Sequence, residues 1–120
     1  DPQNKVILTR IGDAYRNTGN YQASYDYYTR ALNIDFDIYA ALGLALLCKG
    51  EGKYEEAKTN LAKVVDLNQE HDYAQYYLAR CYEQLNDPAN AKVHYQKVVE
   101  LLPETTQRAQ TAKNYLAAHP

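Results

Sequence analysis

Residues 72–105 read DYAQYYLARCYEQLNDPANAKVHYQKVVELLPET, and this stretch predicts two helices joined by a short turn. In its first half, apolar or small side chains recur with the period of a helix and define one packed face. They belong to Ala74, Leu78, Ala79, Cys81, Tyr82 and Leu85. We therefore interpret residues 72–105 as a hairpin of two helices.

The ends of these two helices carry residues that cap or stop helices. Asp72 is followed three residues later by Gln75, a spacing that predicts a capping box. At Asn86-Asp87-Pro88, Asn tolerates a left-handed backbone, Asp caps the next helix and Pro suits its first turn. Pro103 then stops the second helix, because proline cannot continue the ladder of backbone hydrogen bonds.

The same arrangement occurs twice more on the N-terminal side of this hairpin. Residues 5–37 and 38–71 align with residues 72–105 without an internal gap, although the first unit is one residue short. Their turns are predicted at Gly19-Asn20 and at Gly50-Glu51-Gly52. Asp37 is predicted to cap the helix that begins at Ile38. The chain is thus predicted to hold three tandem helix pairs.

These units resemble the tetratricopeptide repeat, whose pattern is W-x2-L-G-x2-Y, then A-x3-F, then A and P. The third unit matches that pattern at Leu78, Ala79, Tyr82, Ala91, Tyr95, Val98 and Pro103. The first matches it at Ile11, Gly12, Tyr15, Gly19, Tyr21, Tyr28, Ala31 and Leu32. The second matches it at Leu44, Ala45, Gly52, Tyr54, Ala57 and Leu61. The Trp position departs from the pattern and holds Leu8, Ala41 and Gln75.

The resemblance implies an all-α fold, a right-handed α-solenoid of three helix pairs within a single domain, residues 1–120. A further helix is expected at residues 106–118, where Lys113 replaces the small residue of a full repeat, as suits a polar-backed cap. Residues 1–4, Asp-Pro-Gln-Asn, resemble the close of a preceding repeat. We therefore expect the natural protein to continue on the N-terminal side.

In proteins of this kind the first helix of each pair lines a concave groove where ligand peptides lie. The side of those helices that faces away from the packed positions carries many tyrosines, which offer large contact area and a hydroxyl. An apolar patch on a surface is typical of an interface. The candidate partner-binding residues are Tyr39, Leu42, Leu46, Tyr73, Tyr76, Tyr77 and Arg80. The same side also carries Val6, Thr9, Arg10, Asp13, Arg16, Asn17, Gly43, Glu83 and Gln84.

Two known binding modes of the family are not expected. Members that bind chaperone tails hold the terminal carboxylate with Lys, Asn and Arg. The corresponding positions here are Thr9, Asp13, Gly43, Tyr73 and Tyr77, so we expect no carboxylate clamp. Members with an asparagine ladder have Asn where this chain has Arg10, Gly43 and Tyr77. The expected ligand is a peptide or helix with apolar or aromatic side chains.

The chain shows no pattern of an enzyme, a metal site or a cofactor site. His71, His94 and His119 are scattered, and solvated side chains are expected at all three. Cys48 and Cys81 match no zinc or redox spacing, which leaves two buried thiols or a disulfide between neighbouring helices. The net charge of −2 excludes nucleic acid as an obvious partner, and the apolar run 38–48 is short of the ~20 residues of a membrane span.

We therefore expect a non-catalytic module for protein–protein interaction. Two alternatives stay open: a scaffold that assembles with copies of itself, and an arm that targets a larger protein. Free thiols favour a reducing compartment such as the cytoplasm. Fold alone does not choose the partner or the pathway.

Overall fold

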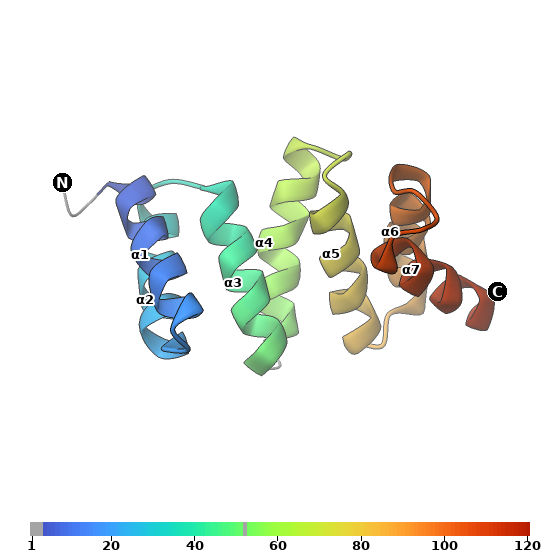
Figure 1. Cartoon of the computed structure of the whole chain (residues 1–120), viewed down its shortest axis with the longest axis horizontal. Helices are drawn as coiled ribbons and strands as arrows, with labels where there is room; N and C mark the ends of the chain where they lie inside the picture. The colour runs from blue at the N-terminus through green and yellow to red at the C-terminus, as the bar shows by residue number, and fades with distance from the viewer. Residues whose placement is uncertain (1–3, 52) are drawn as a thin grey trace. The chain divides into compact units, whose positions relative to one another are not determined.

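The computed structural model describes residues 4–51 and 53–120, and every regular element within them is an α-helix (Figure 1). The expected all-α class is therefore confirmed. The helices are α1 (Lys5–Asn17), α2 (Tyr21–Ile34), α3 (Ile38–Glu51), α4 (Tyr54–Leu67), α5 (Asp72–Gln84), α6 (Pro88–Leu101) and α7 (Gln107–Ala118).

Some expectations fall outside the described part of the chain. The repeat-like segment at residues 1–4 lies there except for its last residue, Asn4. Gly52 of the predicted second turn also lies outside it, whereas Gly50 and Glu51 belong to α3. The side chain of Cys48 is likewise not described. Cys81 is a free thiol, so the disulfide alternative is wrong and the alternative of buried thiols holds for Cys81.

The chain divides into two compact units, residues 1–53 and residues 54–120, and each is considered by itself. Unit 1 contains α1, α2 and α3, and unit 2 contains α4, α5, α6 and α7. The predicted repeats 5–37, 38–71 and 72–105 each cover two of the helices, and the second has one helix in each unit. The division of a single domain into these repeats stays a prediction.

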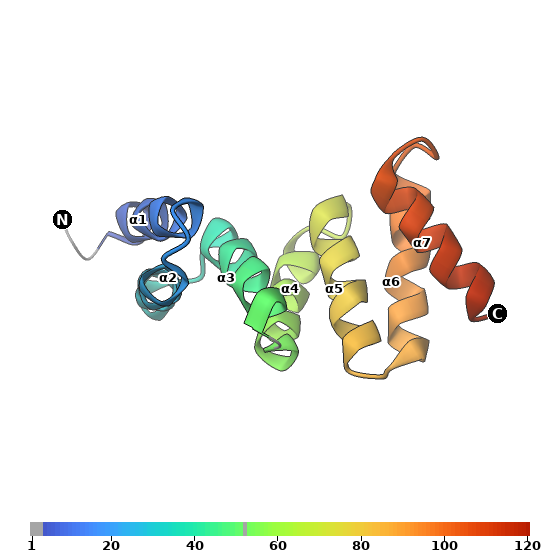
Figure 2. The same cartoon turned by 60° about the horizontal axis from the view of Figure 1, so that its bottom comes forward.

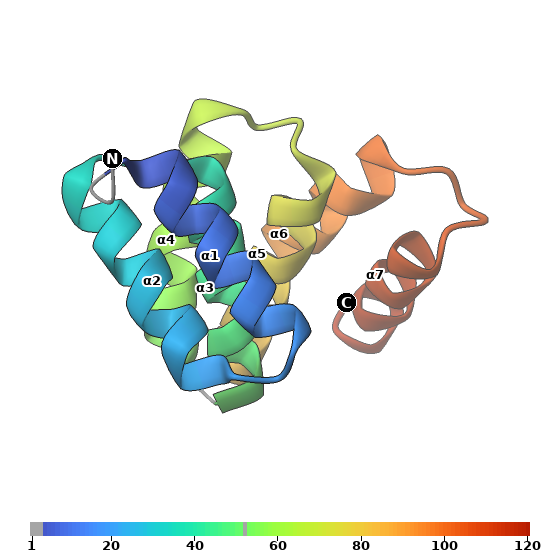
Figure 3. The same cartoon turned by 60° about the vertical axis from the view of Figure 1, so that its left-hand side comes forward.

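The core of unit 1 forms where α2 packs against α1 and α3 (Figure 3). Tyr28 of α2 is completely buried at its centre. Its ring lies against Gly12 of α1 and Gly43 of α3, where a side chain of any size would meet it. The other buried members of this core are Leu8, Ala31, Ala40, Leu44 and Leu47.

Side-chain caps begin the helices of unit 1. Asn4 accepts a hydrogen bond from the backbone N–H of Val6 at 2.8 Å and begins α1. Asp37 accepts two, from Tyr39 at 2.8 Å and Ala40 at 3.0 Å, as the sequence predicts for the start of α3. Such caps satisfy N–H groups that have no partner within the helix.

In unit 2, α5 packs between α4 and α6, and α7 lies across α6 (Figure 2). The buried centre is formed by Tyr76 and Ala79 of α5, Ala91, Tyr95 and Val98 of α6, and Ala112 of α7. The expected C-terminal helix is thus present and packed, because its small residues Ala109 and Ala112 are almost fully buried. The amphipathic face of α7 completes the core of this unit.

The turns of unit 2 agree with the sequence in one place and differ in another. Asn86 adopts the left-handed conformation, with φ of 58°, and Asp87 caps α6 through the N–H of Asn90 at 3.2 Å. The capping box predicted at Asp72 and Gln75 is wrong. His71 is the cap instead, because its backbone is extended and its Nδ1 accepts from the N–H of Ala74 at 3.2 Å.

Candidate functional site

Tyr73, Tyr77 and Arg80 lie on one side of α5 in unit 2, and we call this side the outer face of α5. Tyr73 and Tyr77 stand one turn apart, and their ring centroids are 4.5 Å from each other. Both side chains are half-buried, so each keeps part of its ring at the surface. The sequence predicted these two residues on this face, and the structure brings them together.

Tyr76 differs from what the sequence predicted for its side chain. It is only 7% exposed, and its ring meets the ring of Tyr95 edge-on with centroids 6.2 Å apart. Tyr76 also contacts Tyr77 edge-on at 5.1 Å. The reason is that α6 presents a large aromatic side chain to this part of α5, which the local sequence of α5 does not reveal. Its role in binding stays a prediction.

Arg80 is held in place by Tyr76. The guanidinium donates a hydrogen bond to the Tyr76 hydroxyl at 3.1 Å and lies 5.8 Å from the centre of the same ring. This hydrogen bond raises the pKa of the Arg80 guanidinium above its ordinary value. Arg80 is therefore a cation fixed by Tyr76, and it follows Tyr77 by one turn along α5.

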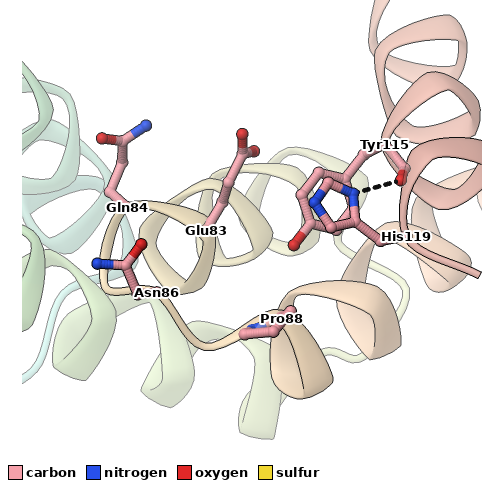
Figure 4. Close-up of a pocket in the computed structure, with 6 residues that line it drawn as sticks. All are labelled: Glu83, Gln84, Asn86, Pro88, Tyr115 and His119. Carbon is pink, nitrogen blue, oxygen red and sulfur yellow. Dashed lines mark hydrogen bonds between the residues drawn. The ribbon is translucent and has the colours of Figure 1, made fainter.

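The same face of α5 continues into a hollow of about 600 Å³ at the α5–α6 turn (Figure 4). Its lining residues are Glu83, Gln84, Asn86, Pro88, Tyr115 and His119. The imidazole of His119 lies over the ring of Tyr115, with centroids 4.0 Å apart. Glu83 accepts a hydrogen bond from the buried Tyr95 hydroxyl at 2.6 Å. The aromatic part of the face thus ends in polar and acidic groups.

Helix α7 borders this face at both ends, which sequence reasoning missed. Arg108 lies 3.8 Å from the carboxylate of Asp72 and 5.6 Å from the centre of the Tyr73 ring. At the other end, Tyr115 and His119 line the hollow. The sequence identified 106–118 only as a cap, and no local signal there indicates which side chains reach α5.

The candidate residues of unit 1 lie on α3. Tyr39 is 73% exposed, and Leu42 and Leu46 are half-buried. Gly43, which the sequence placed on the same outward side, is buried against Tyr28. The outward apolar surface of α3 is therefore narrower than the sequence suggested.

A second hollow, of about 410 Å³, lies in unit 1 between α1 and the start of α3. It is lined by Val6, Thr9, Arg10, Asp13, Asp37 and Tyr39. Asp13 accepts a hydrogen bond from the Tyr28 hydroxyl and pairs with Arg16 at 3.6 Å. Burial and the bond to Asp13 raise the pKa of Tyr28, so its hydroxyl stays protonated and donates.

His94 departs from the expected solvated state. It is half-buried, its ring stacks on Tyr82 with centroids 5.5 Å apart, and its Nδ1 lies 2.7 Å from the side-chain oxygen of the buried Gln75. Burial lowers the pKa of His94. These contacts describe a structural histidine in the packing of α5 against α6.

Cys81 is a buried free thiol, and burial raises its pKa to about 11. Over residues 4–51 and 53–120, histidine, cysteine and acidic side chains form no group of three or more that could hold a metal ion. In the same ranges, none of the helices has the length and apolar character needed to cross a membrane.

Two family models, both described as tetratricopeptide repeat, match the sequence at residues 7–38 and residues 50–116. No curated protein matches the chain by sequence. Several solved structures are similar to it. One is the first TPR of Spaghetti (RPAP3) bound to the HSP90 peptide SRMEEVD, with 23% identity, a TM-score of 0.85, and coverage of 98% of this chain and 94% of that chain.

Two more similar structures come from a plant and a bacterium. The Arabidopsis OM64 TPR domain is 15% identical, with a TM-score of 0.85 and coverage of 99% of this chain and 98% of that one. A tetratricopeptide repeat protein from Parabacteroides merdae is 28% identical, with a TM-score of 0.84 and coverage of 97% of this chain but 45% of that one. At such identities the similarity concerns the fold.

Proposed function

The chain belongs to the tetratricopeptide repeat family, and on that premise we propose that it is a non-catalytic module that binds a peptide or helix of a partner protein. The observation that carries this proposal is the outer face of α5. There Tyr73, Tyr77 and Arg80 stand together beside a hollow of about 600 Å³.

The chemistry of this face suits a segment with apolar or aromatic side chains. Tyrosine rings bury large apolar area with few rotatable bonds, and their hydroxyls form hydrogen bonds with a ligand backbone. Arg80 is already oriented by Tyr76, so little conformational entropy is lost when it pairs with a carboxylate or stacks on an aromatic ring of the ligand.

In unit 1, helix α3 offers a second surface for apolar and aromatic contact with a ligand. Tyr39 is the most exposed of the large apolar side chains that the structure describes, at 73%, and Leu42 and Leu46 follow it along α3. We propose these three residues as a partner-binding surface of unit 1 by itself and assign them apolar contact with a ligand.

We propose that the ligand is not a chaperone tail that ends in a carboxylate. The similar structure that holds SRMEEVD is a different protein at 23% identity. In this chain the corresponding five positions, Thr9, Asp13, Gly43, Tyr73 and Tyr77, include no cation. Asp13 would repel a carboxylate, and Gly43 has no side chain to reach one.

The test begins with peptides selected from a random displayed library on the immobilised chain, and the affinity of a selected peptide is then measured by fluorescence anisotropy. Tyr39→Ala and Tyr77→Ala should each weaken binding about tenfold or more, as expected for aromatic anchors. Val93→Ala is the matched control, because Val93 is 62% exposed on α6 and lies outside the surface.

The peptide SRMEEVD enters the same assay as a second probe, and it should not bind. Micromolar binding of SRMEEVD would contradict the proposed ligand class. Selected peptides whose affinity is unchanged by both tyrosine variants would contradict the proposed surface. Thermal unfolding of each variant is measured beside its affinity, so that lost binding is separated from lost folding.

Self-association is a second candidate, favoured by the exposure of Tyr39. A second copy of the chain would cover that ring and the leucines beside it. Light scattering from micromolar to millimolar concentration should then show a dimer that Tyr39→Ala weakens. If the chain stays monomeric across that range, self-association is excluded and peptide binding remains the proposed function. The targeting-arm alternative stays a prediction.

A further inference from the structure

Thr9 has an unusual position in the hollow of unit 1. The residue lines the hollow and is only 4% exposed, and its hydroxyl has no hydrogen-bond partner among residues 4–51 and 53–120. A buried hydroxyl without a partner is unfavourable. Thr populates two χ1 rotamers in helices, so a second orientation is available to this hydroxyl. A ligand group there would satisfy it.

Two of the other lining residues, Asp37 and Asp13, carry acceptors with negative charge, and Asp13 already accepts from Tyr28 and pairs with Arg16. Asp37 is 8% exposed, and its Oδ1 already accepts from the N–H groups of Tyr39 and Ala40, which holds the carboxylate in place. A carboxylate has about four acceptor positions, so Asp37 keeps capacity for a further donor. Asp13 is the second carboxylate of the lining.

The edge of the hollow is formed by Tyr39 and Arg10. The Tyr39 ring is 73% exposed, and its face attracts a cation. Among the described residues that line the hollow, Arg10 alone is basic, and it is exposed on a long flexible side chain. Its guanidinium can move into water, whereas Asp37 is held by its backbone bonds.

We propose that this hollow binds the ammonium group of a lysine side chain. The ammonium has three donors and no acceptor, which matches the Thr9 hydroxyl and the carboxylates of Asp37 and Asp13. Its aliphatic stem lies against Val6 and the Tyr39 ring. The inference rests on the proposed function, because the lysine belongs to the docked partner segment.

The test uses N-acetyl-lysine N-methylamide as the probe, added to the ¹⁵N-labelled full chain and followed by two-dimensional NMR. Saturable shifts are expected for the backbone amides of Thr9, Arg10 and Tyr39. The norleucine analogue has the same stem without the charge and should bind about tenfold more weakly. The glutamate analogue tests the opposite charge and should leave these amides unchanged.

Two variants of the lining locate the response. Thr9→Val removes the hydroxyl at nearly constant shape, and Asp37→Asn removes a charge while Asn still caps α3. Each should weaken the lysine response about tenfold. Thr29→Val is the matched control, because the Thr29 hydroxyl is also buried without a partner in the described chain but lies on α2, outside the hollow lining.

Equal responses to the lysine and norleucine probes would overturn the inference, as would a response to the glutamate probe at the same amides. A lysine response that Thr9→Val and Asp37→Asn leave unchanged would also overturn it. The probe is a single amino acid derivative, so failure here leaves peptide binding at α5 intact. If the peptide selection fails, the NMR experiment still tests the lysine site, because its probe is not a selected peptide.

Discussion

The ring of Tyr28 fills the space that a side chain on Gly43 would need. A β-carbon built at Gly43 would lie 2.6 Å from the Tyr28 hydroxyl oxygen, closer than real β-carbon contacts. The hydroxyl itself donates to Asp13 and accepts from the Nε of Arg16 at 3.1 Å, so the ring cannot withdraw without loss of these bonds. Gly43 is therefore required by packing within unit 1.

Gly43→Ala should destabilise the chain by about 1–3 kcal/mol, because overpacking outweighs the roughly 0.5–1 kcal/mol that alanine gains in a helix. Urea unfolding measures the change. In a Tyr28→Leu background, where the shorter side chain does not reach α3, the same substitution should be neutral or stabilising. An equal loss in both backgrounds would show that Tyr28 is not the cause.

Tyr76→Ala should cost about 3–5 kcal/mol of unfolding free energy, because its ring is buried against Tyr95. Tyr39→Ala should change it by no more than about 0.5 kcal/mol, since that ring is 73% exposed. Chemical denaturation of both variants makes the comparison. Similar losses for the two would contradict the placement of Tyr76 in the core.

Cys81 should make stability depend on alkaline pH. Burial raises the pKa of its thiol from 9.0 to about 11, so the folded state keeps a proton that the unfolded chain releases. The stabilisation from this thiol is complete below pH 9 and is lost as pH rises towards 11. The measurement is the difference in unfolding free energy between the chain and Cys81→Ala from pH 8 to 11. A constant difference would contradict it.

His94 should make stability depend on mildly acidic pH, in the opposite direction. Burial lowers its pKa below 6.5, so the unfolded chain takes up a proton before the folded state does. The neutral side chain contributes stability above pH 6.5, and this contribution is lost as pH falls through that value towards the folded pKa. Thermal unfolding at pH 5.5 and 7.5 measures it, and His94→Gln should reduce the difference.

The imidazole of His94 also offers a direct check by NMR titration. Its resonances should shift with a midpoint below 6.5, because the charged form is poorly solvated next to Tyr82 and Gln75. A midpoint at or above 6.5 would show that the ring is solvated, as the sequence had suggested.

Much of the fold could be predicted from the sequence because its determinants are local. The left-handed Asn86, the cap at Asp87 and the cap at Asp37 each depend on residues within one turn of the helix that follows. The cap of α5 was mispredicted at Asp72 because His71 has the extended backbone of a cap and its imidazole accepts the same kind of bond.

The candidate site could be predicted only in part. Helical periodicity placed Tyr73, Tyr77 and Arg80 on one face, and the structure brings them together. Periodicity does not indicate how far a neighbouring helix reaches over that face. For this reason the burial of Tyr76 under Tyr95 and the contacts from α7 could not be predicted.

By itself, then, the sequence determined the helices, the caps at Asp37 and Asp87 and the family to which the chain belongs, since these follow from spacing and backbone preference between residues close in sequence. Tertiary structure alone decided which outward-facing residues stay exposed to solvent. Tyr39 stays exposed, while Gly43 and Tyr76 are covered by tyrosines from other helices. The reason is that burial depends on the size of side chains from distant positions, which packing brings together.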